Sequence, residues 1–75
     1  MTVEELFKKL GKDNICEVMY AKDMSIQEAE EECAFSCTRH PDGFLLTFAL
    51  LWVTDWKIAY VEDDKIYIAL TIQQD

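Results

Sequence analysis

Apolar side chains recur every three or four residues near the start of the chain, which places them on one face of a helix. Thr2 precedes this segment and Glu5 lies three residues later, the spacing at which each side chain satisfies the other's backbone N–H at a helix start. Gly11 is well placed to end the helix. The pattern therefore predicts a helix over 3–10. Its apolar face consists of Val3, Leu6, Phe7 and Leu10.

A second helix is predicted from about Ile26 to Cys37. Ser25 followed by Glu28 repeats the capping signature, and three consecutive glutamates from 30 to 32 favour helix. Its spacing predicts an inward stripe of Ile26, Ala29, Cys33 and Cys37. The residues predicted to point outward are Glu28, Glu31, Glu32 and Phe35.

Residues 15–20 fit two structures. The positions of Ile15, Val18 and Met19 suit a helix, whereas the β-branched and aromatic content suits a strand. We expect a strand and keep the helix as an alternative.

The apolar period changes to two after residue 43. The sequence His40-Pro41-Asp42-Gly43 predicts a turn, and residues 44–53, apolar on both faces, read as a central strand. Residues 56–61 and 66–72 then alternate as two half-buried strands. We expect a three-residue loop over 63–65, because a two-residue loop would place the apolar residues of these two strands on different faces of the sheet. We also expect the last strand to be an open edge. The shared face would hold Trp56, Ile58, Tyr60, Ile68, Leu70 and Ile72.

These elements predict one small α+β domain over 1–75. Two N-terminal helices pack on a three-stranded antiparallel C-terminal meander, with an extra short strand at 15–20. The alternative is a winged-helix-like fold of three helices and a hairpin, which applies if 15–20 is helical.

Charge and composition limit the classes of partner and the cellular location that we expect. Fifteen acids against seven bases give a net charge of −8, which repels nucleic acid and anionic lipid. The longest apolar run, Phe44 to Val53, is too short to span a bilayer.

The start of the chain lacks the pattern of a secretory signal. The number of cysteines, three, is odd, and we interpret them as reduced thiols. We therefore expect a cytoplasmic protein with no membrane and no direct nucleic-acid partner.

Cysteine and histidine provide the sharpest chemical pattern. Cys33, Cys37 and His40 have metal-ligand spacing, and Cys16 would complete a tetrahedral zinc set. Both helical cysteines lie on the predicted apolar stripe, however, and the paired C-x2-C knuckles of strong zinc motifs are absent. We therefore predict buried thiols and no cofactor. Cys37 and His40 could form a nucleophile pair on spacing alone, but the sequence has no other catalytic signature, so we expect no enzyme.

The aromatic content and the acidic second helix favour an interaction role. The outer face of the final hairpin should form a patch of low charge that packs against a protein partner or a second copy. We expect a non-catalytic protein-binding module, such as an inhibitor or accessory factor. One alternative is an acidic mimic that blocks a nucleic-acid-binding protein, and a further one is a winged-helix-like regulator. The predicted contact residues are Glu28, Glu31, Glu32, Phe35, Ala59, Val61, Tyr67 and Ala69.

Overall fold

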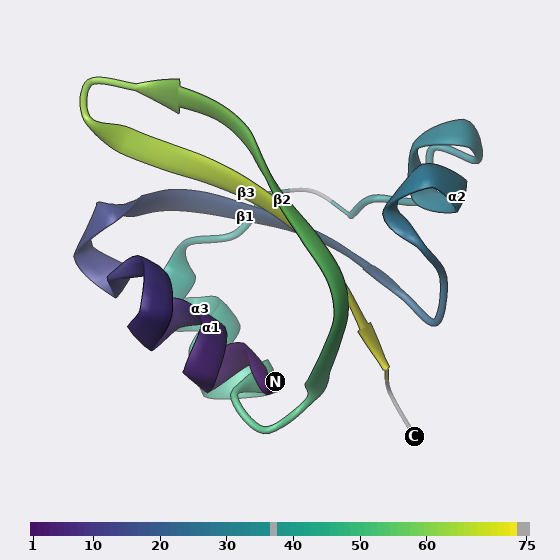
Figure 1. Cartoon of the computed structure of the whole chain (residues 1–75), viewed down its shortest axis with the longest axis horizontal. Helices are drawn as coiled ribbons and strands as arrows, with labels where there is room; N and C mark the ends of the chain where they lie inside the picture. The colour runs from purple at the N-terminus through teal and green to yellow at the C-terminus, as the bar shows by residue number, and fades with distance from the viewer. Residues whose placement is uncertain (37, 74–75) are drawn as a thin grey trace.

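The protein is an α+β domain with a three-stranded mixed sheet in a computed structural model that describes residues 1–36 and 38–73. Figure 1 shows α1 and α3 side by side against the sheet, α2 set apart from them, and the β2–β3 hairpin extending away from the helices. The strand order is β1-β3-β2. The elements are α1 (Val3–Leu10), η1 (Lys12–Asn14), β1 (Ile15–Lys22), α2 (Ile26–Glu31), α3 (Pro41–Phe48), β2 (Trp52–Glu62) and β3 (Lys65–Gln73).

The first helix forms as the sequence predicts. The Thr2 hydroxyl accepts a hydrogen bond from the Glu5 N–H, and the Glu5 carboxylate accepts one from the Thr2 N–H, which completes the capping box. Gly11 ends the helix at φ 85°, a left-handed value that glycine adopts without a steric cost. Three residues of the predicted apolar face are buried, which anchors α1 to the core. They are Val3, Leu6 and Phe7.

Residues 15–22 are a strand, which confirms the preferred interpretation of that segment and removes the basis of the winged-helix alternative. This strand, β1, pairs with β3 in parallel, so the sheet is mixed and the predicted purely antiparallel meander is wrong. Parallel pairing is possible because two helices and β2 lie between the paired strands, which supplies the long connection that it requires.

The segment from Phe44 is a helix, so the predicted strand over 44–53 is wrong. His40 caps α3, since its Nδ1 accepts a hydrogen bond from the Asp42 N–H at 3.2 Å. Pro41 occupies the first turn, where its missing N–H costs nothing. The predicted turn at 40–43 is therefore the start of a helix. Pro41, Phe44 and Phe48 are buried at helical spacing, while Leu46 points to solvent.

The hairpin joining β2 to β3 has a two-residue turn, and the predicted three-residue loop is wrong. Asp63 and Asp64 both have positive φ, at 50° and 63°, and Glu62 pairs with Lys65. Such turns match the right-handed twist of the strands. Trp56 and Ile58 still align with Leu70 and Ile68, because a bulge between Ile58 and Tyr60 absorbs the change of register.

The last strand is central, not an open edge. β3 lies between β1 and β2, and its residues from 68 to 72 are buried on both faces. Ile68, Leu70 and Ile72 pack in the main core with α1 and α3. Ala69 and Thr71 alternate with them and therefore face the opposite side, where α2 contacts β3. β3 thus has the doubly covered role that the sequence suggested for residues 44–53.

The second helix is shorter than predicted. It ends at Glu31 rather than Cys37, and Cys33 has φ 53°, a left-handed backbone that stops a helix. Ile26 and Ala29 are buried as expected. Cys33 is exposed, so its predicted inward position is wrong, and Cys37 lies outside the described residues.

Aromatic rings fill the space between the two long helices and the sheet. Phe44 is fully buried and contacts three other rings, with centroid distances of 5.9 Å to Phe7, 5.1 Å to Tyr20 and 4.9 Å to Phe48. These rings hold α3 against α1 and β1, and α3 in turn fixes the position at which β2 begins.

Candidate interaction surface

The second half of β2 exposes apolar side chains along the edge of the sheet. Ile58, Tyr60 and Val61 are 46%, 52% and 63% exposed, and we call these three residues the β2 rim. Ile58 and Val61 align with core-side residues of β3, whereas the bulge turns Tyr60 to the opposite face, where its ring stacks on Tyr67 at 4.2 Å. The rim therefore presents apolar side chains from both faces of the strand.

The two outer edges of the sheet are covered to different extents. On β1, Val18 exchanges two backbone hydrogen bonds with Arg39, at 2.9 and 2.8 Å. On β2, the Val53 N–H donates to the Met1 carbonyl at 2.8 Å. Within the described residues, no backbone bond joins positions 54–62 of β2 to any element other than β3. The open edge is thus the part of β2 that carries the rim.

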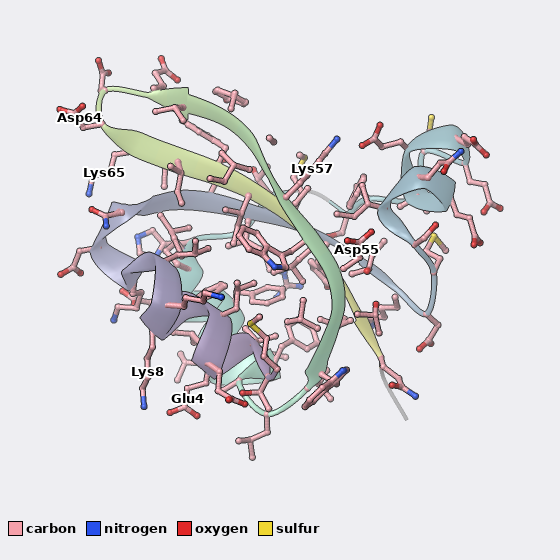
Figure 2. All side chains as sticks on the ribbon, viewed as in Figure 1. Glu4, Lys8, Asp55, Lys57, Asp64 and Lys65 are labelled. Carbon is pink, nitrogen blue, oxygen red and sulfur yellow. The ribbon has the colours of Figure 1, made fainter. Side chains whose placement is uncertain are left out.

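Charged side chains border the rim on the α2 side of the sheet. Lys57 forms an ion pair with Glu30, and the Asp55 carboxylate accepts hydrogen bonds from the N–H groups of Ile26, at 3.4 Å, and Trp56, at 2.9 Å. In Figure 2 Asp55 and Lys57 lie toward α2, and Asp64 lies at the tip of the hairpin. These contacts link α2 to β2, and Glu28 and Glu31 on the same helix are exposed.

The net charge is divided unequally between the two sides of the molecule. Residues 1–12 contain three lysines and two glutamates, and residues 41–54 contain one aspartate, so these segments are neutral together. They include α1, α3 and the start of β2. The whole net charge of −8 therefore lies in residues 13–40 and 55–75. The three strands carry three acids and three lysines, so the excess of acids lies in α2, the hairpin tip and the connecting segments. We call α2 and the hairpin tip the acidic side, and the α1–α3 layer the neutral side.

A second exposed apolar group lies where α3 leads into β2. Leu46 is 89% exposed, Leu50 is 81% exposed and Trp52 is 54% exposed, and we call these three residues the leucine–tryptophan cluster. The Glu4 N–H donates to the Ala49 carbonyl at 3.0 Å, which attaches this turn to the start of α1. The cluster thus belongs to the neutral side.

The predicted contact residues do not form one surface. Glu28, Glu31 and Glu32 are exposed on or just after α2, and Phe35 is half-buried beyond it. Tyr67 and Ala69 share the sheet face that α2 partly covers, but Ala69 is fully buried and cannot reach a partner. Ala59 is the half-buried residue of the bulge, and Val61 aligns with Ile66 on the other face.

Sequence reasoning missed the leucine–tryptophan cluster and the Ile58 and Tyr60 part of the rim. Leu46 and Leu50 lay in the apolar run assigned to a central strand, where both would be buried. One signal was available: His40-Pro41-Asp42 is an N-cap residue, a proline and an acid in series, which is a helix start as well as a turn. Helical spacing from that start turns Leu46 away from Phe44.

The predicted zinc residues are not assembled in the described part of the chain. Cys16 is half-buried on β1, Cys33 is exposed, and His40 caps α3. Cys16 and His40 line a shared hollow of about 300 Å³, without Cys33. Across residues 1–36 and 38–73, no three potential ligands are grouped.

The Cys16 thiol has a different partner. Its hydrogen bond with the Tyr67 hydroxyl, aided by desolvation, raises the pKa of that phenol. Elsewhere, Lys12 and Asp42 form a 2.7 Å ion pair that joins η1 to the start of α3. The hydrogen bond and charge of Lys12 lower the pKa of the Asp42 carboxyl. Both contacts join neighbouring elements: Cys16 and Tyr67 join β1 to β3, and Lys12 and Asp42 join η1 to α3.

Comparison with known proteins adds no further constraint. No family model, curated protein or solved structure matches this chain. Among the described residues, no helix has the length and apolar character needed to cross a bilayer.

Proposed function

We propose that this chain is a non-catalytic protein-binding module that contacts a basic partner along the β2 rim. The observation that carries the proposal is the exposure of three large apolar side chains on the open edge of the sheet. Exposed apolar residues bordered by polar ones are typical of interaction sites. The rim residues are three of the six exposed large apolar residues in the described part of the chain.

The charge around the rim indicates what kind of partner it suits. Glu62, Asp63 and Asp64 follow the rim directly at the hairpin tip, and the exposed glutamates of α2 lie along the same acidic side. Lys57, which precedes the rim on β2, is paired with Glu30. A partner with lysine or arginine beside an apolar patch would therefore gain both burial and favourable charge contacts.

The rim is tested by affinity capture with two matched double variants. The full chain is immobilised and exposed to lysate of its source, beside Ile58→Ser/Val61→Ser and the control Leu46→Ser/Leu50→Ser. Both variants replace exposed aliphatic residues, so both should fold, as far-UV circular dichroism would verify. We expect a captured protein that is retained by the control variant and lost with the rim variant. Equal capture by the rim variant would refute the proposal.

The segregation of charge favours a second candidate, an acidic mimic of a nucleic-acid backbone. Acids outnumber bases on α2 and at the hairpin tip, and such a surface suits a groove built for phosphates. This function predicts loss of capture with Glu62→Gln/Asp63→Asn/Asp64→Asn rather than with the rim variant. It also predicts release as salt rises from about 50 to 500 mM, and displacement by added duplex DNA.

A further inference from the structure

The leucine–tryptophan cluster has no role in the function proposed above. Leu46 and Leu50 are the two most exposed large apolar residues in the described chain. They lie four residues apart, at the end of α3 and in the turn after it, and Trp52 follows at the start of β2. All three lie within seven consecutive residues, so they belong to one exposed apolar segment of the chain.

The surroundings of the cluster are uncharged. From Gly43 to Thr54, twelve residues in succession carry no ionisable side chain. The neighbouring helix α1 has balanced charges, and its Glu4 and Lys8 form an ion pair at 3.6 Å; Figure 2 shows both on the same side of α1. The cluster is therefore an apolar patch on the neutral side of a strongly acidic molecule.

This charge distribution determines which occupant the cluster suits. A basic partner gains nothing from a neutral patch, because its cations would find no carboxylates there. Two copies of the chain have the opposite requirement, since each has a net charge of −8 and they must meet where that charge is absent. Contact through the α3 end meets this requirement, whereas contact through β2 would bring the acidic sides together.

Distance further reduces repulsion between two copies joined in this way. The acidic hairpin tip lies at the far end of β2, eleven residues from Trp52, and the curved strand places the two at a separation bounded by the 29 Å length of the molecule. That separation exceeds the Debye length of about 8 Å at physiological ionic strength. The α2 glutamates lie on the sheet face opposite α1 and α3. Most of the like charges would therefore be screened from one another.

A stable contact between two copies would occupy a defined share of the surface of each. A standard interface takes about 800 Å² from each partner, which is roughly a sixth of the 4661 Å² exposed by one copy. Leu46, Leu50 and Trp52, at 89%, 81% and 54% exposed, would form the centre of that area. A two-fold axis through the patch would place each cluster against the same residues of the other copy.

We propose that the protein is a homodimer, formed by isologous contact of the leucine–tryptophan clusters of two copies. This interface goes beyond the proposed partner-binding role and leaves both β2 rims exposed. Each copy of the dimer would therefore keep its rim accessible, and capture through the rim would not depend on dimerisation.

The oligomeric state is measured by sedimentation velocity and light scattering on the full chain, from about 1 to 500 μM. We expect the mass to rise from 8.8 kDa to twice that value. Leu46→Ser/Leu50→Ser should weaken the dimer about 100-fold or more, because each substitution removes apolar contact on both copies. The matched control Ile58→Ser/Val61→Ser should dimerise as the wild type does. Added salt should strengthen the dimer by screening like charge.

The fluorescence of Trp52 provides an independent measurement of dimer formation. In the Trp56→Phe variant Trp52 is the sole indole, and its emission should shift to shorter wavelength as concentration rises and water is excluded. A mass of one chain at every concentration would overturn the proposal. It would also be overturned by a dimer that survives Leu46→Ser/Leu50→Ser and is lost with the rim variant. A monomer whose partner capture still depends on Ile58 and Val61 would refute the dimer alone and leave the proposed function standing.

Discussion

The opposite fates of Phe44 and Leu46 provide the sharpest test of the fold. On a strand, residues two apart share one face, so the two side chains would be buried or exposed together. On α3 they point in nearly opposite directions, and Phe44 is fully buried while Leu46 is almost fully exposed. Replacing each by alanine therefore distinguishes the helix from the strand that the sequence pattern suggested.

The two alanine substitutions should differ greatly in their effect on the free energy of unfolding. Phe44→Ala should lower the free energy of unfolding by about 3–5 kcal/mol, because it leaves a cavity among tightly packed rings. A chain of this length has about 4–11 kcal/mol in total, at roughly 0.05–0.15 kcal/mol per residue. The variant should therefore be barely stable, with a Tm lower by about 12 °C or more. Leu46→Ala should change stability by no more than about 0.5 kcal/mol.

The assay is urea unfolding followed by tryptophan fluorescence, at about 1 μM so that self-association contributes little. Phe44→Leu is included because Phe44→Ala could abolish folding. It keeps most of the apolar volume and should cost about 1–2 kcal/mol. Equal losses for Phe44→Ala and Leu46→Ala would refute the helical placement of this segment. So would a loss at Leu46 greater than the loss at Phe44.

Three further outcomes follow from local contacts. Thr2→Ala should lower the free energy of unfolding by about 1 kcal/mol in urea titrations, because it removes the helix cap; no change would contradict the capping role. The hydrogen bond from the Thr2 N–H lowers the pKa of Glu5 below its usual 4.5. The stability that this hydrogen bond contributes is therefore complete above pH 4.5 and is lost as the pH falls through the lowered pKa of Glu5. The stability advantage of the wild type over Glu5→Gln should shrink in acid, and a constant difference would argue against this bond. Asp64→Gly should raise Tm by about 2–6 °C, because glycine adopts the positive φ of the turn without steric cost; a lower Tm would contradict the turn. Cys16→Ala should lower the pKa of Tyr67, measured as phenolate absorbance during alkaline titration, and an unchanged curve would exclude the thiol as the cause.

The sequence alone determined the elements that are specified by contacts between residues close together in the chain. The capped helix over 3–10 was predictable because Thr2, Glu5 and Gly11 each satisfy backbone groups within a few residues. The strands around Trp56 and Ile68 were predictable because side chains that alternate every two residues suit a half-buried strand. Segregation of charge between chain segments was also readable, since it requires only counting.

Tertiary structure decided the rest. The run from Phe44 to Val53 is apolar throughout, so its own pattern has no period that distinguishes helix from strand; packing of Phe44 and Phe48 against Phe7 and Tyr20 settles it. Pairing of β1 with β3 joins residues about 50 positions apart, and no local pattern specifies which strand becomes central. The candidate surfaces depend on that choice. Once β3 is central, β2 becomes the open edge that exposes Ile58 and Val61, and the turn after α3 exposes Leu50, because solvent exposure is a property of the assembled fold and not of any one segment.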